Sequence, residues 1–502
     1  MKKLKDLFRM LMKPEERSLK IKTIRAAAWS MLGRGGSRIL RLASSLVLTR
    51  ILFPEAFGLM ATATVMLAMI QLFADTGVKT AIIQNPRGAE PQFLNTAWII
   101  SICRGVLLFF IVAGMSWPMS RFYGQPELMG LLLLMALNPL ISGFENPALV
   151  LFIKQFRVEK QVAYELGTHL LSIITSIILA IILNSVYALA IGSVSLVFYR
   201  VSASYIIEPY RPHFAWDKES GSELLSFGKY IFLNTLITWA AMNGDVILIG
   251  KLLNMDLLGL YNLGKNIGQV VITFCLLVFM QAYMPAVSSV LHDLPRVMRI
   301  YQRTSALVLT IAIPLSVVIA LFAEDIIRLL YDPRYLMASI GVFWISLSGV
   351  FHVISLITSN TFIAMGRPVY ETIAMAIGLI LVGVFIPLGA SREGLNGAAF
   401  GMFAAITLIT VVESVILVRG IKFSLKTVLR PWFQTLTVSA AIGGIFYLLR
   451  PWLESDHFFN FPFLIIMTVI GLLVSGGVYI FLEGRHPFRD QEGATKIGVS
   501  NQ

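Results

Sequence analysis

The chain has 502 residues, of which 57% are hydrophobic and only 14% are charged, and its mean hydropathy is +0.77. Soluble chains usually carry about a quarter of charged residues, so this composition excludes a soluble globular protein. The formal net charge of +13 would suggest nucleic-acid binding in a soluble protein. Here the basic residues stand at the ends of long apolar runs, as in membrane proteins, and we expect no nucleic-acid partner.

The first 22 residues are basic and precede the first apolar run. Lysines and one arginine alternate with Leu and Phe up to Pro14. This pattern predicts an amphipathic helix on the lipid headgroups, and a plain basic tail is the alternative.

Apolar runs of about 20 residues follow, which favours helices over the strands of about ten residues in membrane β-barrels. We expect about fourteen transmembrane helices in an all-α polytopic protein. They lie at about 24–48, 58–82, 94–116, 128–150, 162–183, 186–207, 228–250, 257–283, 304–323, 336–363, 370–390, 395–418, 432–450 and 461–482.

The basic residues between these runs predict the orientation of the chain. Most of the 41 Lys and Arg residues fall on one side when the N-terminus is placed in the cytoplasm. We therefore expect both termini to be cytoplasmic. The expected organisation is a basic segment, an N-lobe of six helices, a linker, a C-lobe of six helices, two further helices and a tail, at residues 1–22, 23–208, 209–227, 228–420, 421–484 and 485–502.

A short internal repeat supports the two lobes. The segment from Thr49 to Leu59 resembles the segment from Gly250 to Leu260: a base, two apolar residues, a turn, an acid and then a glycine. Each copy joins the first and second helix of a six-helix block. Both copies fall on the external side of the expected topology, so we expect pseudo-symmetric lobes related about an axis along the membrane normal, around a central cavity.

The first span carries three arginines that lipid would not tolerate. At about 100° per residue, Arg34, Arg38 and Arg41 fall within roughly 60° on one helix face. An arginine at mid-membrane costs about 2.5 to 3.5 kcal/mol even on the lenient insertion scale. We expect these side chains to face a wet cavity that an anion visits, and internal ion pairs are the alternative.

Other polar residues inside spans are further candidates. A stripe on the eighth span would add a cation and amides to the cavity: Asn262, Lys265, Asn266 and Gln269. Asp245 would either bind a coupling ion or pair with Lys265. Arg104 would face the cavity, or it would pair with an acid such as Glu145 or Glu165.

Besides Asp245, three further residues are candidates for ion coupling or gating. Glu165 and His169 are four residues apart on one span, a spacing that suits proton transfer or a structural pair. Asp75 ends the second span, where a cap or a gate is the simpler role. The two cysteines have no metal-binding spacing, so we expect no metal, cofactor or catalytic residue; a proton or Na+ is left open as a coupling ion.

Three stretches together resemble a known family. They are LTRILFPEAFGLMATATV at Leu48 to Val65, FADTGVKTAIIQ at Phe73 to Gln84, and GLYNLGKNIGQVV at Gly259 to Val271. In this order and spacing the chain, from residue 24 to about 420, is similar to the polysaccharide transporter family. These are the Wzx-type oligosaccharide flippases of the multidrug/oligosaccharidyl-lipid/polysaccharide exporter superfamily, and the exopolysaccharide and colanic-acid exporter branch looks most similar.

The resemblance implies a flippase in the bacterial inner membrane. Its substrate would be an undecaprenyl-diphosphate-linked oligosaccharide, moved from the cytoplasmic to the periplasmic leaflet by alternating access. Membrane lipids and the glycan polymerase or export machinery would be partners, and nothing in the sequence requires more than a monomer. A drug exporter of the same fold is an alternative, but cationic drugs favour acids in the cavity. A membrane glycan polymerase fits poorly, because the external loops are short.

Overall fold

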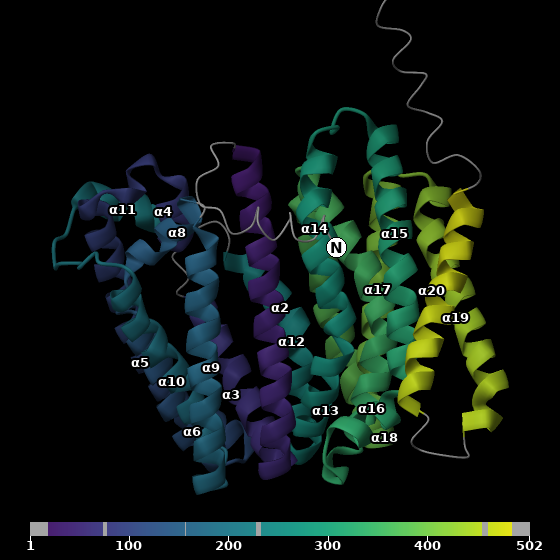
Figure 1. Cartoon of the computed structure of the whole chain (residues 1–502), viewed down its shortest axis with the longest axis horizontal. Coiled ribbons are helices and arrows are strands. Elements are labelled where there is room, and N and C mark those ends of the chain that lie inside the picture. The colour runs from purple at the N-terminus through teal and green to yellow at the C-terminus, as the bar shows by residue number, and fades with distance from the viewer. Residues whose placement is uncertain (1–18, 74–77, 156, 227–231, 454–459, 484–502) are drawn as a thin grey trace, which may run out of the picture. The chain divides into compact units, whose positions relative to one another are not determined.

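A computed structural model describes residues 19–73, 78–155, 157–226, 232–453 and 460–483, and every element within these ranges is a helix (Figure 1). The protein is therefore an all-α polytopic membrane protein, as the composition predicts. Most of the expected amphipathic segment and all of the expected tail lie outside the described residues.

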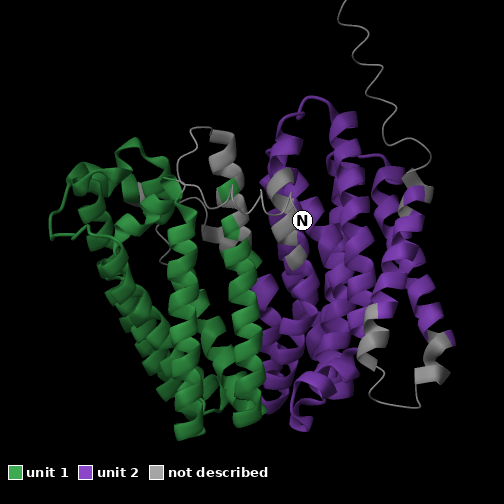
Figure 2. Cartoon of the chain, viewed as in Figure 1, with its two compact units in different colours: residues 1–239 green, residues 240–502 purple. Residues whose placement is uncertain are grey.

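The chain forms two compact units, Met1–Trp239 and Ala240–Gln502 (Figure 2). The division falls within helix α12 (Phe232–Leu252). The lobe limits expected near residues 208 and 228 stay a prediction.

In the first unit, long apolar helices alternate with short ones at the joints. Pro91 begins α5, where a missing N–H costs nothing, and Gly124 ends it at a positive φ of 67°. The helices are α2 (Leu19–Ile51), α3 (Pro54–Phe73), α4 (Val78–Gln84), η1 (Pro86–Ala89), α5 (Pro91–Tyr123), α6 (Glu127–Met135), α7 (Leu137–Ser142), η2 (Pro147–Val150), α8 (Leu151–Lys154), α9 (Val158–Leu183), α10 (Tyr187–Ile207) and α11 (Lys218–Ser226).

The second unit has a larger apolar core, built from α14, α15, α17, α18 and α19. Its fully buried side chains include Tyr301, Phe322 and Phe362. The helices after α12 are α13 (Met255–Gly268), α14 (Val270–Ser288), α15 (Leu294–Leu321), α16 (Ala323–Leu330), η3 (Pro333–Tyr335), α17 (Ala338–Ala364), α18 (Pro368–Gly420), α19 (Leu425–Leu453) and α20 (Asn460–Glu483).

The structure does not confirm the expected number of fourteen spans. Among the described residues, seven helices are long and apolar enough to cross a membrane, or eight if one bent pair counts as a span. One cause is that the expected span 257–283 is broken at Gln269, between α13 and α14. Another is that the expected spans 370–390 and 395–418 join in α18, where the helical backbone is interrupted at Glu393 and at Gly394, whose φ is +57°.

The two copies of the repeat have the same local structure. In the first copy, α2 ends at Ile51 and α3 begins at Pro54; in the second, α12 ends at Leu252 and α13 begins at Met255. The amide of Leu52 bonds the carbonyl of Leu48 at 2.8 Å, and Leu253 bonds Ile249 in the same way at 2.9 Å. The resemblance seen in the sequence is therefore a repeated helix–turn–helix joint.

The linker after α10 is bound to the first unit. The Tyr210 hydroxyl donates to Asn95 Oδ1 at 2.7 Å, and the Phe214 ring packs on Trp98 with the ring centroids 4.9 Å apart. Leu224 of α11 is buried in the small core that α4 and α5 form. The linker therefore folds as part of this unit.

Arg87 forms ion pairs with several acidic residues near the linker. Arg87 of η1 forms ion pairs with Glu90, Asp217, Glu219 and Glu223. The hydrogen bond to Glu90 and the charge of Glu219 hold the pKa of Arg87 above its ordinary value.

Asp217 also caps α11. Its carboxylate accepts hydrogen bonds from the amide and the hydroxyl of Ser220, and these bonds hold the pKa of Asp217 below its ordinary value.

Candidate functional site

Helix α2 packs on α9 through its small residues. A Cβ on Gly33 would lie 2.7 Å from Val162 Cγ2, and one on Gly36 would lie 3.1 Å from Leu166 Cδ2. Only glycine lets the two helices approach this closely at Gly33. Gly33 and Gly36, which flank Arg34, thus serve packing.

A second face of α2 is apolar and uncovered within the first unit. Leu32, Ile39 and Leu42 are 59%, 68% and 38% exposed. Because these are large apolar side chains on a long helix, this face is suited to lipid.

The arginines occupy a third face. At 100° per residue, the centre of the arginine face lies about 140° from the centre of the face that Gly33 and Gly36 pack on α9, and about 110° from the centre of the apolar face. Arg34 and Arg41 are exposed and Arg38 is half-buried. The structure records no ion pair for Arg34 or Arg41 within the described part of the chain. The helix therefore separates its cations from both its protein-packing face and its apolar face.

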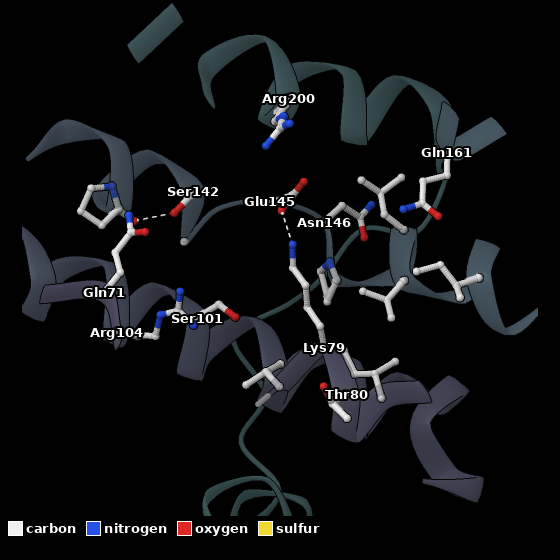
Figure 3. Close-up of a pocket in the computed structure, with 18 of the residues that line it drawn as sticks. Gln71, Lys79, Thr80, Ser101, Arg104, Ser142, Glu145, Asn146, Gln161 and Arg200 are labelled. Atoms are coloured by element: carbon white, nitrogen blue, oxygen red, sulfur yellow. Dashed lines mark hydrogen bonds and ion pairs between the residues drawn. The ribbon is translucent and has the colours of Figure 1, made fainter. Parts of the chain in front are cut away.

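The first unit also contains a pocket of about 630 Å³, a size typical of ligand sites. Its polar lining comes from six elements and the segment between α7 and η2, as Figure 3 shows. The polar residues are Gln71 of α3, Lys79 and Thr80 of α4, Ser101 and Arg104 of α5, Ser142 of α7, Glu145 and Asn146 after it, Gln161, Tyr164 and Glu165 of α9, and Arg200 of α10.

Two features of the backbone create this pocket. The segment 127–154 is not one straight span, because its two parts meet at an angle of 74°. The break between Ser142 and Pro147 carries Glu145 and Asn146. A Cβ on Gly105 would lie 2.5 Å from the carbonyl oxygen of Pro139, so α5 and α7 touch through their backbones and bring Arg104 beside the break.

Glu145 is the centre of a polar network. It accepts a hydrogen bond of 2.6 Å from the Tyr164 hydroxyl and forms an ion pair of 3.5 Å with Lys79. Asn146 donates to the carbonyl of Tyr210 at 2.8 Å and caps η2. These bonds hold the break open in a fixed geometry, and they leave amide, hydroxyl and charged groups on the pocket wall.

Arg200 also lines this pocket, and it is not among the site residues expected from the sequence. It lies two turns before the end of α10, and its Nη2 is 3.2 Å from His169 Nε2. Its Nε is buried without a hydrogen-bond partner in the described structure. Arg41 of α2 is also within electrostatic range of His169. The position of Arg200 inside the apolar run Tyr187–Ile207 was the sequence signal that could have identified it.

The residues expected on α9 divide between two surroundings. Glu165 lines the pocket and accepts a hydrogen bond from Gln161 at 2.9 Å. His169 lies one turn further along the helix and contacts Arg200. Glu165 therefore has Gln161 as a side-chain partner, and His169 has Arg200.

In the second unit, Lys265 and Asp245 form a buried ion pair. Lys265 Nζ is 2.6 Å from Asp245 Oδ2, and the Tyr261 hydroxyl donates to the same oxygen at 2.7 Å. The side chains of Lys265 and Asp245 are 9% and 0% exposed. Of the two roles open to Asp245, pairing with Lys265 is the one that the structure contains.

The amides of the same stripe have other surroundings. Asn262 and Gln269 are half-buried and Asn266 is exposed, whereas Lys265 is buried. Asp75 lies outside the described residues. In the described ranges, no group of three or more His, Cys, Asp or Glu side chains is placed to hold a metal ion.

Comparisons with known proteins bear on the family and the fold of the chain. Residues 47–340 match the family model described as "Polysaccharide biosynthesis protein". An "Uncharacterized membrane protein in cps region" of Klebsiella pneumoniae is 22% identical over 391 residues, which are 76% of this chain and 80% of that protein. The "Lipopolysaccharide biosynthesis protein WzxC" of Escherichia coli (strain K12) is 19% identical over 453 residues, 85% of this chain and 88% of that protein.

Solved structures show the same fold. The structure described as "Lipid II flippase MurJ, inward closed conformation" has a TM-score of 0.69 at 14% identity, and the match covers 90% of this chain and 98% of that one. An inward-facing multidrug resistance MATE family transporter has a TM-score of 0.58, also at 14% identity, over 75% and 92% of the two chains.

Proposed function

Because the chain belongs to the polysaccharide biosynthesis protein family, we propose that it flips a lipid-linked oligosaccharide across the bacterial inner membrane. It is a multi-pass membrane transport protein and not an enzyme. The finer proposal is that the substrate is an undecaprenyl-diphosphate-linked repeat unit of an exopolysaccharide or O-antigen, which moves from the cytoplasmic to the outer leaflet by alternating access, with both termini in the cytoplasm.

The observation that carries the proposal is the arginine face of α2. Three guanidinium groups lie on a face that neither α9 nor the apolar stripe occupies, and Arg34 and Arg41 have no ion pair in the described structure. Unpaired cations in a membrane helix are expensive unless a wet space and an anion stabilise them. A diphosphate meets this requirement, since each guanidinium can pair two phosphate oxygens at once.

The pocket in the first unit supplies a second kind of contact. Its amides, hydroxyls and two carboxylates match the hydroxyl groups of a sugar, and Lys79, Arg104 and Arg200 provide positive charge beside them. We assign the sugars to this pocket and the diphosphate to α2. In the second unit we assign polar contacts to Asn262, Asn266 and Gln269, while Lys265 neutralises Asp245 and acts through the packing of its unit.

The energetics favour outward movement of such a substrate. With a negative cytoplasm, each exported negative charge gains about 2.3 kcal/mol per 100 mV of membrane potential. The potential can therefore drive transport of a diphosphate without a coupled ion.

The test is to express this protein in cells that lack their own flippase for one glycan and to measure how much of that glycan the cells export. Each guanidinium–phosphate contact contributes about 1.5 to 3 kcal/mol, so we expect Arg34→Gln/Arg41→Gln to reduce export by roughly tenfold or more per arginine. Arg→Lys at both positions keeps the charge without the planar fork and should give an intermediate loss. Arg200→Gln tests the pocket in the same assay, with an expected partial loss of export.

Arg121→Gln is the matched control, because Arg121 is an exposed cation at the end of α5, where it lies over the Trp117 ring. Full export by the α2 double variant at wild-type expression would overturn the proposal. Resistance to cationic drugs that disappears with the same variant would instead favour the drug exporter.

A further inference from the structure

A second hollow lies in the other unit, between α15 and α19. These helices pack together (Figure 1), and the groove between them has a volume of about 620 Å³. It is lined by Gln302 of α15 and by one face of α19: Leu425, Lys426, Leu429, Arg430 and Phe433. No part of the proposed transport site contributes to it.

The groove concentrates positive charge without an acid to balance it. Lys426 and Arg430 are four residues apart in the first two turns of α19, and the first turn contains no acidic residue. The N-terminal end of a helix already carries a partial positive charge, so cations are disfavoured there. Neither side chain has an ion pair in the described ranges, and Arg430 Nη2 is shielded from solvent without a hydrogen-bond partner. A bound anion would satisfy the buried nitrogen of Arg430 and offset the positive charge at this helix end.

An exposed apolar stripe continues from the cations along the helix. Leu425, Leu429, Phe433 and Leu436 are 58%, 51%, 55% and 61% exposed, and they recur at three- and four-residue intervals. A long apolar chain lying along this stripe would cover Leu429 and Phe433 while its charged end stays beside Lys426 and Arg430. A free phosphate would leave the stripe uncovered.

We propose that this groove binds an anionic phospholipid of the surrounding bilayer. The phosphate pairs with Arg430 and Lys426, and the Leu429–Phe433 stripe holds an acyl chain. Basic pockets between transmembrane helices are a known kind of lipid headgroup site. A lipid satisfies both the charge and the apolar stripe at once, and it is available to this surface at all times.

The test uses the full-length protein in nanodiscs of phosphatidylcholine into which phosphatidylglycerol is titrated, with the thermal midpoint of unfolding as the readout. Each basic residue at a membrane surface contributes about 1 kcal/mol to anionic lipid binding. We therefore expect half-maximal stabilisation by phosphatidylglycerol to require roughly 30-fold more lipid in Lys426→Gln/Arg430→Gln. Lys426→Gln alone, a change at an exposed side chain, should weaken the response roughly fivefold and provides a variant that folds if the double variant does not.

Arg157→Gln/Lys218→Gln removes the same charge from exposed positions of the first unit and should respond like the wild type. An unchanged response of the Lys426→Gln/Arg430→Gln variant would overturn the proposal. Full stabilisation by inorganic phosphate or glycerol phosphate would also overturn it, because the acyl chain would then be irrelevant. Native mass spectra that show a dimer lost in the double variant, with equal lipid retention, would assign the groove to a second copy of the chain.

Discussion

Replacing Lys265 with methionine should leave the buried carboxylate of Asp245 without its ion-pair partner. Asp245 Oδ1 is already without a partner in the described structure, and Oδ2 would keep only the hydrogen bond from Tyr261. Removing one member of a buried ion pair typically costs about 3 to 5 kcal/mol, because the remaining charge stays desolvated. Replacing both members with neutral groups of similar size is often neutral.

The magnitude is large enough for a thermal measurement. A change of 1 kcal/mol shifts the midpoint by about 2 to 4 °C in units of about 200 residues, so Lys265→Met should lower it by on the order of 10 °C. Asp245→Asn/Lys265→Met should recover most of this loss. Tyr261→Phe should cost less than Lys265→Met, since it removes one hydrogen bond to a charged group.

The assay is a double-mutant cycle on purified protein in one detergent, with export by the same variants in cells. A Lys265→Met midpoint within 1 or 2 °C of the wild type would refute the reasoning, as would a double variant no more stable than the single ones. If the double variant is stable and exports glycan, Lys265 acts through Asp245. If it is stable but inactive, Lys265 also contacts the substrate.

Two further predictions concern packing and pH. Gly33→Leu should destabilise the first unit by about 1 to 3 kcal/mol through a clash with Val162, measured as a lower thermal midpoint and lower expression. Gly35→Leu is the matched control, because nothing lies within 4 Å of a Cβ at that position. Equal losses in the two variants would contradict the close packing at Gly33. Because the pKa of Asp217 is lowered in the folded linker, its carboxylate should stabilise α11 above its ordinary pKa of about 3.9, and this contribution should be lost as the pH falls below that value. A nitroxide label on Ser222→Cys, in a background without Cys103 and Cys275, should become mobile below about pH 4. In the Asp217→Ala variant the same label should be mobile at pH 7. A label that stays immobile in Asp217→Ala would show that the cap does not hold the helix.

The sequence by itself determined the all-helical membrane fold. A chain in lipid must satisfy its backbone hydrogen bonds internally, so apolar runs of about 20 residues become helices. The position of Arg34, Arg38 and Arg41 on one face follows from the helical period alone. The repeat at Arg50 and Lys251 likewise predicted two joints of the same local structure. These features depend only on neighbours in the chain.

Tertiary structure decided which polar residues are satisfied inside the protein and which line a hollow. Lys265 shares a helix with Asn266, yet Lys265 turns to Asp245 on α12 while Asn266 is exposed, because burial depends on which helix covers each face. The pocket exists because a 74° bend and a backbone contact at Gly105 bring Glu145 and Arg104 together. A hydropathy profile cannot predict such side-chain contacts, since the groups that satisfy a buried charge come from helices distant in the sequence.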